Sequence, residues 1–199
     1  KEFRHVVHVQ PCPFDPRLPV EVWIDPGYQG AYAVLAMQIA GEVVRQIDEV
    51  YARGIVVPDI IRECKARPWW RRVRGGVIDI AGAQHQGMES HVEAWHRLAG
   101  LGLRYQPVGI ADGILRHRTF LADPATGQPR LFHDPRCVNT IREYGLYRYM
   151  EVKENRPERE EPIDANNHAM KAIAYGLVAN FGLVSGPRRP RSMKARIRG

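Results

Sequence analysis

Three short stretches of the sequence decide the fold, because in each of them an aspartate adjoins an apolar run. They are VEVWIDPGYQG at residues 20–30, VIDIAGAQ at residues 77–84 and PIDANNHAMKAIAYGL at residues 162–177. In the first stretch, the alternating residues Val20–Ile24 predict a strand that ends in a turn at Asp25. In the second, the apolar run Val77–Ala81 predicts a buried strand. Its Asp79 shares a face with apolar neighbours, where a carboxylate needs a cation or a metal as its partner.

The third stretch predicts the clearest helix of the chain. Apolar residues recur with a period of about 3.6 from Ala169 to Phe181, which is typical of an amphipathic helix. Asp164 is the predicted N-cap of this helix, and Gly182 is the residue at which we expect it to end.

Further apolar patterns lie between these stretches. They predict strands at Ala31–Ile39, Glu42–Tyr51 and Tyr105–Ala111, helices from Pro58, over Met88–Ala99, soon after residue 112 and from Asn139, and a hairpin around residues 123–127. Short connections that contain glycine make the first three strands an antiparallel meander. The order of elements predicts an α/β protein with a ribonuclease H-like mixed sheet, in which antiparallel strands one to three are joined by parallel strands and helices flank both faces.

In this topology, strands one and four are neighbours and the last helix packs across them, so that Asp25, Asp79 and Asp164 converge at one end of the sheet. Clustered carboxylates repel each other, which raises their pKa values unless a divalent cation neutralises them. Ligand sets made only of oxygen favour Mg²⁺ or Mn²⁺ over zinc. Two such ions, about 3.5–4 Å apart, can activate water and stabilise the leaving oxygen of a phosphodiester. The sequence therefore predicts metal-dependent hydrolysis of nucleic acid.

Composition excludes several other classes of protein. The 199 residues, of which 44% are hydrophobic and 26% charged, are typical of one globular domain and not of a disordered or fibrous chain. No apolar run approaches the roughly 20 residues that span a bilayer. The three cysteines lack CxxC spacing, which argues against a disulfide scaffold or a zinc ribbon. We expect a soluble intracellular domain.

The net charge of +7 comes almost entirely from one end of the chain. Residues 186–199 hold six basic residues and no acid, while the rest has 23 basic and 22 acidic residues. We therefore divide the chain into a proline-rich lead-in at 1–19, which cannot form a regular ladder or helix, a domain at 20–183 and a flexible basic tail at 184–199. In the tail, the residues expected to contact polyanions such as DNA are Arg188, Arg189 and Arg191.

Weaker candidates for DNA contact lie inside the domain. Trp69 and Trp70 directly precede Arg71, Arg72 and Arg74, and this mixture is typical either of a surface that holds the DNA backbone or of core tryptophans beside solvated arginines. A second group of residues is less informative. Lys171 is expected either near the carboxylates, where it would hold a phosphate of DNA or lower the pKa of a carboxylate, or in solvent. Glu63 and Asp112 are weaker candidate acids, and His5, His8, His85 and His91 are interpreted as surface residues.

The three aspartate stretches resemble the nuclease domain of large terminase subunits, the DNA-packaging motors of tailed phages. The resemblance extends from Val20 to Leu183 and includes DPRCVNTIREYGLYRYM at residues 134–150. It implies a two-metal endonuclease acting on double-stranded DNA in the cytoplasm of a bacterial host. It also implies an ATPase domain upstream of this chain. The implied partners are the portal and small terminase subunits, and no contact with a membrane is expected. A start at Lys1 and the lack of a GxxxxGK[ST] motif agree with a missing ATPase domain.

The resemblance also assigns roles to residues. Asp25 matches the metal ligand of the first strand, Asp79 the acid of the fourth strand and Asp164 the acid that precedes the last helix. His168 matches the histidine of that last motif, as an auxiliary ligand or a proton relay. The chain departs from the family pattern at Asn167, Lys171 and Ala174. The match to the family at Asp164 is therefore weaker than the matches at Asp25 and Asp79.

Other functions stay open on the sequence. The nearest alternative is another ribonuclease H-like nuclease, of the junction-resolvase or RNase H type. A second is a non-catalytic module that docks on DNA through the basic tail, with acids that are structural. A fragment of an actin-like sugar kinase is disfavoured, because such folds need two lobes and about twice this length.

Overall fold

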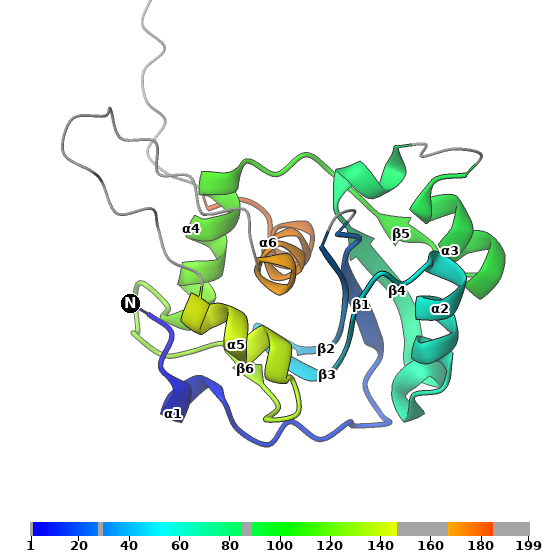
Figure 1. Cartoon of the computed structure of the whole chain (residues 1–199). Helices are drawn as coiled ribbons and strands as arrows, with labels where there is room; N and C mark the ends of the chain where they lie inside the picture. Colours follow the sequence, from blue (N-terminus) through cyan, green and yellow to red (C-terminus); the bar gives the residue numbers. More distant parts are fainter. Residues whose placement is uncertain (1, 28–29, 85–88, 147–166, 185–199) are drawn as a thin grey trace, which may run out of the picture.

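A mixed sheet of six strands is the central layer of the structure, a computed structural model that describes residues 2–27, 30–84, 89–146 and 167–184. The strands lie in the order β5-β4-β1-β2-β3-β6 (Figure 1). Their bounds are β1 Val20–Asp25, β2 Ala31–Ala40, β3 Val43–Arg53, β4 Val73–Ile78, β5 Leu103–Arg104 and β6 Leu131–His133.

The pairing confirms the predicted topology. Strands β1, β2 and β3 form an antiparallel meander, while β4 pairs with β1, β5 with β4 and β6 with β3 in parallel. The predicted neighbours, strands one and four, are therefore adjacent at the middle of the sheet. Ile24 lies opposite Ile78 in this pair, so the residues that follow them, Asp25 and Asp79, leave the sheet at the same edge.

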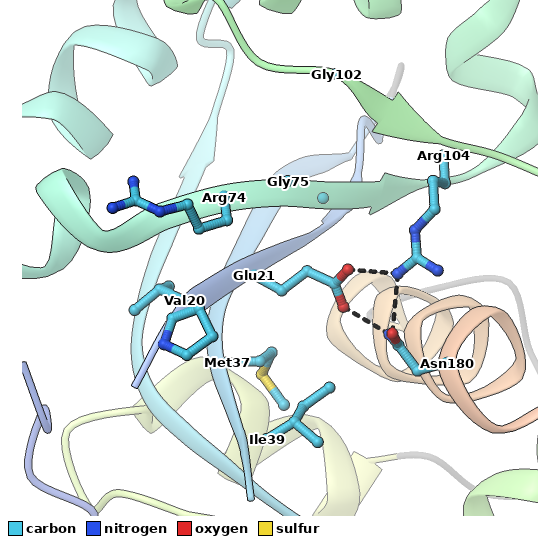
Figure 2. Close-up of a pocket in the computed structure, with 11 residues that line it drawn as sticks. Val20, Glu21, Met37, Ile39, Arg74, Gly75, Gly102, Arg104 and Asn180 are labelled. Atoms are coloured by element: carbon cyan, nitrogen blue, oxygen red, sulfur yellow. Dashed lines mark hydrogen bonds and ion pairs between the residues drawn. The ribbon is translucent and has the colours of Figure 1, made fainter. Parts of the chain in front are cut away.

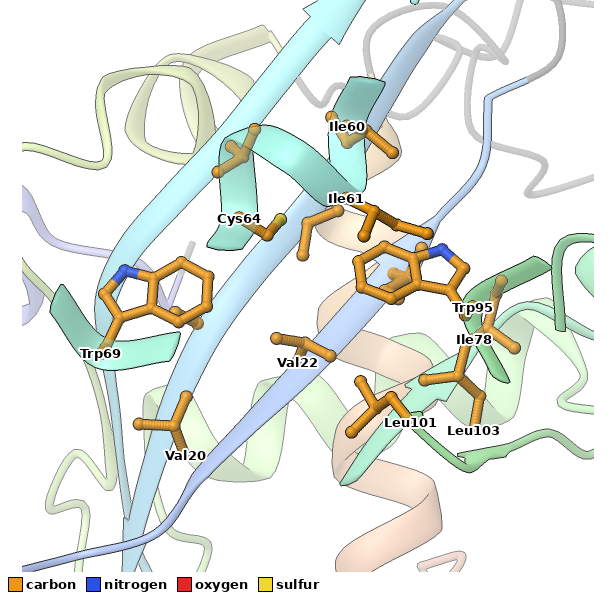
Figure 3. Close-up of a cluster of buried hydrophobic side chains, with 14 of the residues drawn as sticks. Val20, Val22, Ile60, Ile61, Cys64, Trp69, Ile78, Trp95, Leu101 and Leu103 are labelled. Carbon is orange, nitrogen blue, oxygen red and sulfur yellow. The ribbon is translucent and has the colours of Figure 1, made fainter. Parts of the chain in front are cut away.

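Helices cover both faces of the sheet (Figure 1). Their bounds are α1 His5–His8, α2 Val57–Lys65, α3 His91–Ala99, α4 Ile110–Leu121, α5 Val138–Leu146 and α6 His168–Phe181, with two short 3₁₀ helices, η1 Pro68–Arg72 and η2 Ile80–Ala83. On one face, Ile60 of α2 and Trp95 of α3 pack on Val22 of β1 (Figure 3). On the other, α6 packs on the opposite side of β1 and β2, and α4 packs against α6. Because both faces are covered, β1 and β2 are almost continuously apolar.

A glycine lets α6 approach the sheet closely. A Cβ placed on Gly176 would lie 1.9 Å from Cδ2 of Trp23, which is fully buried on β1. No side chain fits in that space, so the ring of Trp23 packs directly on the helix backbone. At its C-terminus, α6 ends at Gly182 with φ of +72°, as the sequence predicts.

Several predicted elements are confirmed with shifted bounds. The helix predicted from Pro58 is α2, and it buries Ile60, Ile61 and Cys64. The helix predicted at 88–99 is α3, and it begins after a capping box in which Ser90 and Glu93 exchange hydrogen bonds. The helix predicted from Asn139 is α5.

Two strand predictions are wrong in their extent. The strand predicted at 105–111 does not form, because Pro107 and Gly109 interrupt it; the paired residues are Leu103–Arg104, and helix α4 begins at Ile110. The strand predicted at 77–81 is β4, which begins earlier and ends at Ile78. Asp79 is therefore not inside the strand but is the N-cap of η2.

Two turn and cap predictions are also wrong. Residues 123–127 form a turn but no hairpin, because the preceding element is helix α4 and the following strand β6 pairs in parallel with β3. Asp164 is not the N-cap of the last helix; α6 begins at His168 after Asn167, and Asp164 lies outside the described residues.

The lead-in packs onto the domain. It forms one turn of helix, α1, and Val9 makes a parallel bridge to His133, so the prediction that it holds no helix or ladder is wrong. His8, interpreted from the sequence as a surface residue, is fully buried and its Nε2 donates to the carbonyl of Leu121 at 2.8 Å. The compensating hydrogen bond is what allows this imidazole to be buried.

Buried polar groups join α4, β6 and α5 beneath this lead-in. The Gln46 amide donates to Thr140 Oγ1 at 2.9 Å, so its oxygen accepts from His133 Nδ1 at 2.7 Å. His133 Nε2 is then an acceptor for the Tyr144 hydroxyl at 3.0 Å, and the Tyr144 oxygen accepts from His117 Nε2 at 2.6 Å. His133 must be neutral in this chain of hydrogen bonds, because its Nδ1 donates while its Nε2 accepts.

No helix within the described residues has both the length and the apolarity that crossing a bilayer requires.

The contact between Gly176 and Trp23 can be tested by adding one methyl group. Gly176→Ala should lower the free energy of unfolding by about 1–3 kcal/mol, because neither the indole ring nor the helix backbone can move aside cheaply. Gly145→Ala is the matched control, since a Cβ added there would have nothing within 4 Å and helix propensity favours alanine. Urea unfolding measures both; equal effects in the two variants would contradict the close packing.

The buried histidines predict a loss of stability in mild acid. Burial lowers the pKa of His117 to about 4, whereas an unfolded chain titrates near 6.5. The unfolded state therefore binds more protons between these values, and stability falls as pH decreases from about 6.5 to about 4, by up to about 3 kcal/mol for His117. Urea unfolding at pH 7.5 and pH 5 should show this loss, and His117→Gln should reduce it. His96→Gln, on the exposed surface of α3, should leave it unchanged; equal pH dependence in both variants would contradict the assignment.

Candidate functional site

Asp25 is the last residue of β1 and is buried, with 4% of its surface exposed. The chain turns immediately after it. Gly27 has φ of +42°, and a Cβ on it would lie 1.9 Å from the carbonyl oxygen of Ala31, so only glycine fits. This tight turn leaves Asp25 at the end of a rigid central strand, with its carboxylate directed towards α6.

Asp79 follows the neighbouring strand and is half-buried. Its backbone N–H donates to the carbonyl of Ile24 at 3.2 Å, which ties it to the end of β1. Its Oδ1 accepts from the Ala81 N–H at 3.1 Å, and its Oδ2 accepts from the Tyr175 hydroxyl of α6 at 3.1 Å. These bonds fix the carboxylate in orientation beside Asp25.

His168, the first residue of α6, contacts Asp25. Its Nδ1 lies 2.6 Å from Asp25 Oδ2, and because an ionised carboxylate only accepts, Nδ1 carries the proton. The imidazole packs against the turn that follows β1, since a Cβ on Gly30 would lie 2.1 Å from His168 Nε2. Of the four predicted site residues, the structure thus brings Asp25, Asp79 and His168 together.

Burial raises the pKa of Asp25, because an ionised carboxylate loses hydration inside the protein. The neighbouring His168 and Lys171 lower this pKa, and the negative charge of Asp79 raises it. Lys171 is therefore within electrostatic reach of the carboxylates, one of the two positions that the sequence left open. Burial has the largest of these effects, so an additional positive charge next to Asp25 would stabilise its ionised form.

The donor set suits a hard divalent cation. Two carboxylates leave adjacent strands at one edge of the sheet, and a cation between them would relieve both their repulsion and the cost of burying Asp25. Among the described residues, no three acidic, histidine or cysteine side chains are grouped closely enough to hold a metal by themselves. Asp25 and Asp79 are thus a partial ligand set, and the predicted third ligand, Asp164, lies outside the described residues.

Sequence reasoning missed a buried acid next to His168. Glu143 of α5 is 2% exposed; its Oε1 accepts from the Tyr51 hydroxyl at 2.6 Å, and its Oε2 accepts from the Met170 N–H at 3.1 Å. Met170 lies in the first turn of α6, where N–H groups lack partners within the helix. The side chain of Asn167, the N-cap, makes no capping hydrogen bond. Glu143 therefore caps α6 from another helix and holds His168 in position.

The residue pattern of α5 hid this role. The helix buries Thr140 and Glu143, which are polar, and exposes Val138 and Leu146, which are apolar. The hydrophobic periodicity of the sequence predicts the opposite, with the apolar residues buried and the polar residues exposed. The spacing of Thr140 and Glu143, three residues apart on a single face, was the available signal.

The predicted DNA-binding arginines of the domain lie elsewhere. Arg71 and Arg72 belong to η1, and Arg74 is near the start of β4, about 16 Å along the strand from Asp79 at 3.3 Å per residue. Trp69 belongs to the core, and its indole N–H donates to Asp48 at 2.8 Å. The structure therefore does not bring these arginines to the carboxylates.

Arg74 instead borders a cavity of about 400 Å³ at the opposite end of β1 (Figure 2). Glu21 in this cavity accepts hydrogen bonds from Arg104 of β5, Asn180 of α6 and the indole N–H of Trp23. These polar groups satisfy one another and fasten the C-terminal end of α6 to the sheet. We interpret this cavity as structural.

Other predicted residues are placed as follows. Glu63 and Asp112 are exposed on α2 and α4, and His5 is exposed, as expected. His91 is half-buried, contrary to the surface interpretation, and its Nδ1 lies 3.2 Å from the Tyr32 hydroxyl. The remaining predictions fall outside the described residues: His85, Arg188, Arg189 and Arg191.

Solved structures similar to this chain include a phage large terminase and the nuclease domains of other large terminases. The large terminase of a thermophilic bacteriophage is 21% identical and superposes with a TM-score of 0.71 over 89% of this chain. The nuclease domain of the P22 large terminase is 15% identical, with a TM-score of 0.66 over 91% of both chains. That of the SPP1 large terminase, a structure with bound Mn, is 15% identical, with a TM-score of 0.62 over 87% of this chain and 96% of that one.

The chain therefore has the ribonuclease H-like fold of large-terminase nuclease domains, as predicted. It spans 44% of the length of the thermophilic phage's terminase. No protein-family model matches the sequence, and no curated protein matches it either.

The capping role of Glu143 can be tested with two substitutions. Glu143→Ala should lower the free energy of unfolding by about 2–4 kcal/mol, because it leaves Tyr51 and the first turn of α6 without a buried acceptor. Glu143→Gln keeps an acceptor for Met170 and should cost less than about 1.5 kcal/mol. Urea unfolding distinguishes the two; equal losses would show that the charge of Glu143, not its hydrogen bonds, holds α6.

Proposed function

We propose that this chain is the metal-dependent nuclease domain of a phage large terminase and hydrolyses phosphodiester bonds of double-stranded DNA during genome packaging. The observation that carries the proposal is the convergence of Asp25, Asp79 and His168 at one edge of a sheet with the terminase nuclease fold. The bound Mn of the SPP1 nuclease domain supports a divalent metal. An alternative non-catalytic role gives no reason to keep two adjacent, mutually repelling carboxylates.

Asp25 and Asp79 would hold Mg²⁺ or Mn²⁺, with Asp164 as the third ligand that the resemblance implies; two ions are expected. When bound, such cations supply Lewis-acid activation of the phosphodiester and of the attacking water. Asp25 keeps the proton of His168 on Nδ1, so that Nε2 is the nitrogen available to accept a proton or to bind a ligand. Tyr175 and the Ala81 N–H hold Asp79 in a single orientation, which prepares the site before substrate arrives.

The biological setting follows from the same proposal. The thermophilic phage's terminase is about twice as long as this chain, so we propose an ATPase domain in the same polypeptide. Portal and small terminase subunits are the proposed partners, and the cytoplasm of a bacterial host is the proposed location. The basic residues Arg188, Arg189 and Arg191 are proposed to contact DNA without reading its sequence.

Cleavage of supercoiled plasmid in Mn²⁺ tests the catalytic assignment. Asp25→Asn and Asp79→Asn should each reduce the rate by about 100-fold or more, because each removes an anionic oxygen from the metal. Asp59→Asn on α2, on the other face of the sheet, is the matched control and should cut as the parent does. Cutting by all variants at the parent rate would refute the site, and preferential cleavage of four-way junctions or RNA–DNA hybrids would indicate a different ribonuclease H-like nuclease.

A further inference from the structure

A cavity of about 240 Å³ lies between β3 and α5, beside the candidate site. It is lined by Tyr51, Arg53, Asn139, Arg142, Glu143 and Leu146. Its volume is far above the roughly 10–15 Å³ that a single water needs, so a phosphodiester group can enter. No sequence pattern singled out this region for DNA contact.

The register of the sheet places this cavity close to Asp25. Asp25 pairs with Ala33 of β2, and Ala33 pairs with Tyr51 of β3, so Asp25 and Tyr51 lie in one row and on one face. Two strand spacings separate them by about 10 Å. Arg53 follows on the same face of β3, opposite Ala31. The Tyr51 ring lies 6.4 Å from the His168 ring, so the wall of the cavity is continuous with the candidate site.

The charges at the mouth of the cavity favour an anion. Arg53 and Arg142 are both exposed there, on β3 and α5. Within the described part of the chain, no hydrogen bond or ion pair holds the Arg142 guanidinium. The one acid in the wall, Glu143, is turned inwards to Tyr51 and to the first turn of α6, and burial raises its pKa. Two guanidinium groups beside a sequestered acid are suited to bind phosphate oxygens.

We propose that this cavity binds a backbone phosphate of duplex DNA, close along the strand to the phosphate that is cleaved, with Arg53 and Arg142 as its ligands. The inference rests on the proposed nuclease function, because it assumes that one DNA strand contacts both the cavity and Asp25. His168 lies between these two positions. Contacts to phosphate carry no base information. The subsite would therefore hold DNA of any sequence with the same spacing between the bound phosphate and the carboxylates.

Binding measured without cleavage tests the subsite separately from catalysis. In an Asp79→Asn background with EDTA, fluorescence anisotropy of a labelled duplex gives affinity as a function of salt. Adding Arg53→Gln and Arg142→Gln should weaken binding by about 5- to 30-fold at low salt and make the slope of log K against log salt shallower by about one. The loss should be the same for duplexes of unrelated sequence.

The matched control removes two arginines from the opposite face. Arg62→Gln and Arg97→Gln, on α2 and α3, change net charge equally and should leave the salt slope as it is. Equal losses in both pairs, unchanged binding in the cavity pair or no duplex binding at all would each overturn the subsite. Mn²⁺-dependent plasmid cleavage would still decide the nuclease proposal by itself, since it depends on Asp25 and Asp79.

Discussion

The hydrogen bond between His168 and Asp25 exists because α6 is held at both of its ends. Towards the C-terminus, Gly176 lets the helix rest directly on Trp23, and towards the N-terminus, Glu143 accepts from the first turn. Between these points the helix crosses β1, β2 and β4. A shift of α6 along its axis would break one contact or the other, so His168 has only one position relative to the end of β1. The geometry of the site thus depends on contacts along the whole of α6, and not only on the residues of the site itself.

Carboxylates from outside a helix cap two successive helices. Glu49 of β3 accepts from the N–H groups of Asn139 and Thr140 at the start of α5, at 2.7 and 3.0 Å, and Glu143 of α5 does the same for α6. Each acid neutralises N–H groups that have no partner in their helix and meets the positive end of the helix dipole. Each helix is therefore positioned by an acid of another element, α5 by Glu49 of β3 and α6 by Glu143 of α5. This series of capping contacts begins at β3, continues through α5 to α6 and ends at His168, the first residue of α6.

The sequence predicts the antiparallel meander and the pairing of the first and fourth strands, and it singles out Asp25 and Asp79 as candidate ligands. Asp25 stands out in the sequence because it ends an apolar strand before a turn, and Asp79 because it interrupts an apolar run, where a carboxylate is costly to bury without a partner. The acids that position the site were not predictable in the same way. Glu143 lies on a helix whose buried face is polar, so its periodicity indicates the opposite orientation. The short strand Leu103–Arg104 was missed because two paired residues leave almost no period-2 signal.

Register, and not proximity in sequence, determines which cations lie near the carboxylates. Arg74 precedes Asp79 by five residues, but an extended strand carries the two to opposite ends of the sheet. Arg53 is remote from Asp25 in sequence, yet antiparallel pairing through Ala31 returns it to the same edge. A cluster of arginines beside tryptophans therefore says little about a site at the end of a strand. The arginines that lie towards Asp25, Arg53 and Arg142, come instead from β3 and α5, the elements whose capping interactions also orient His168.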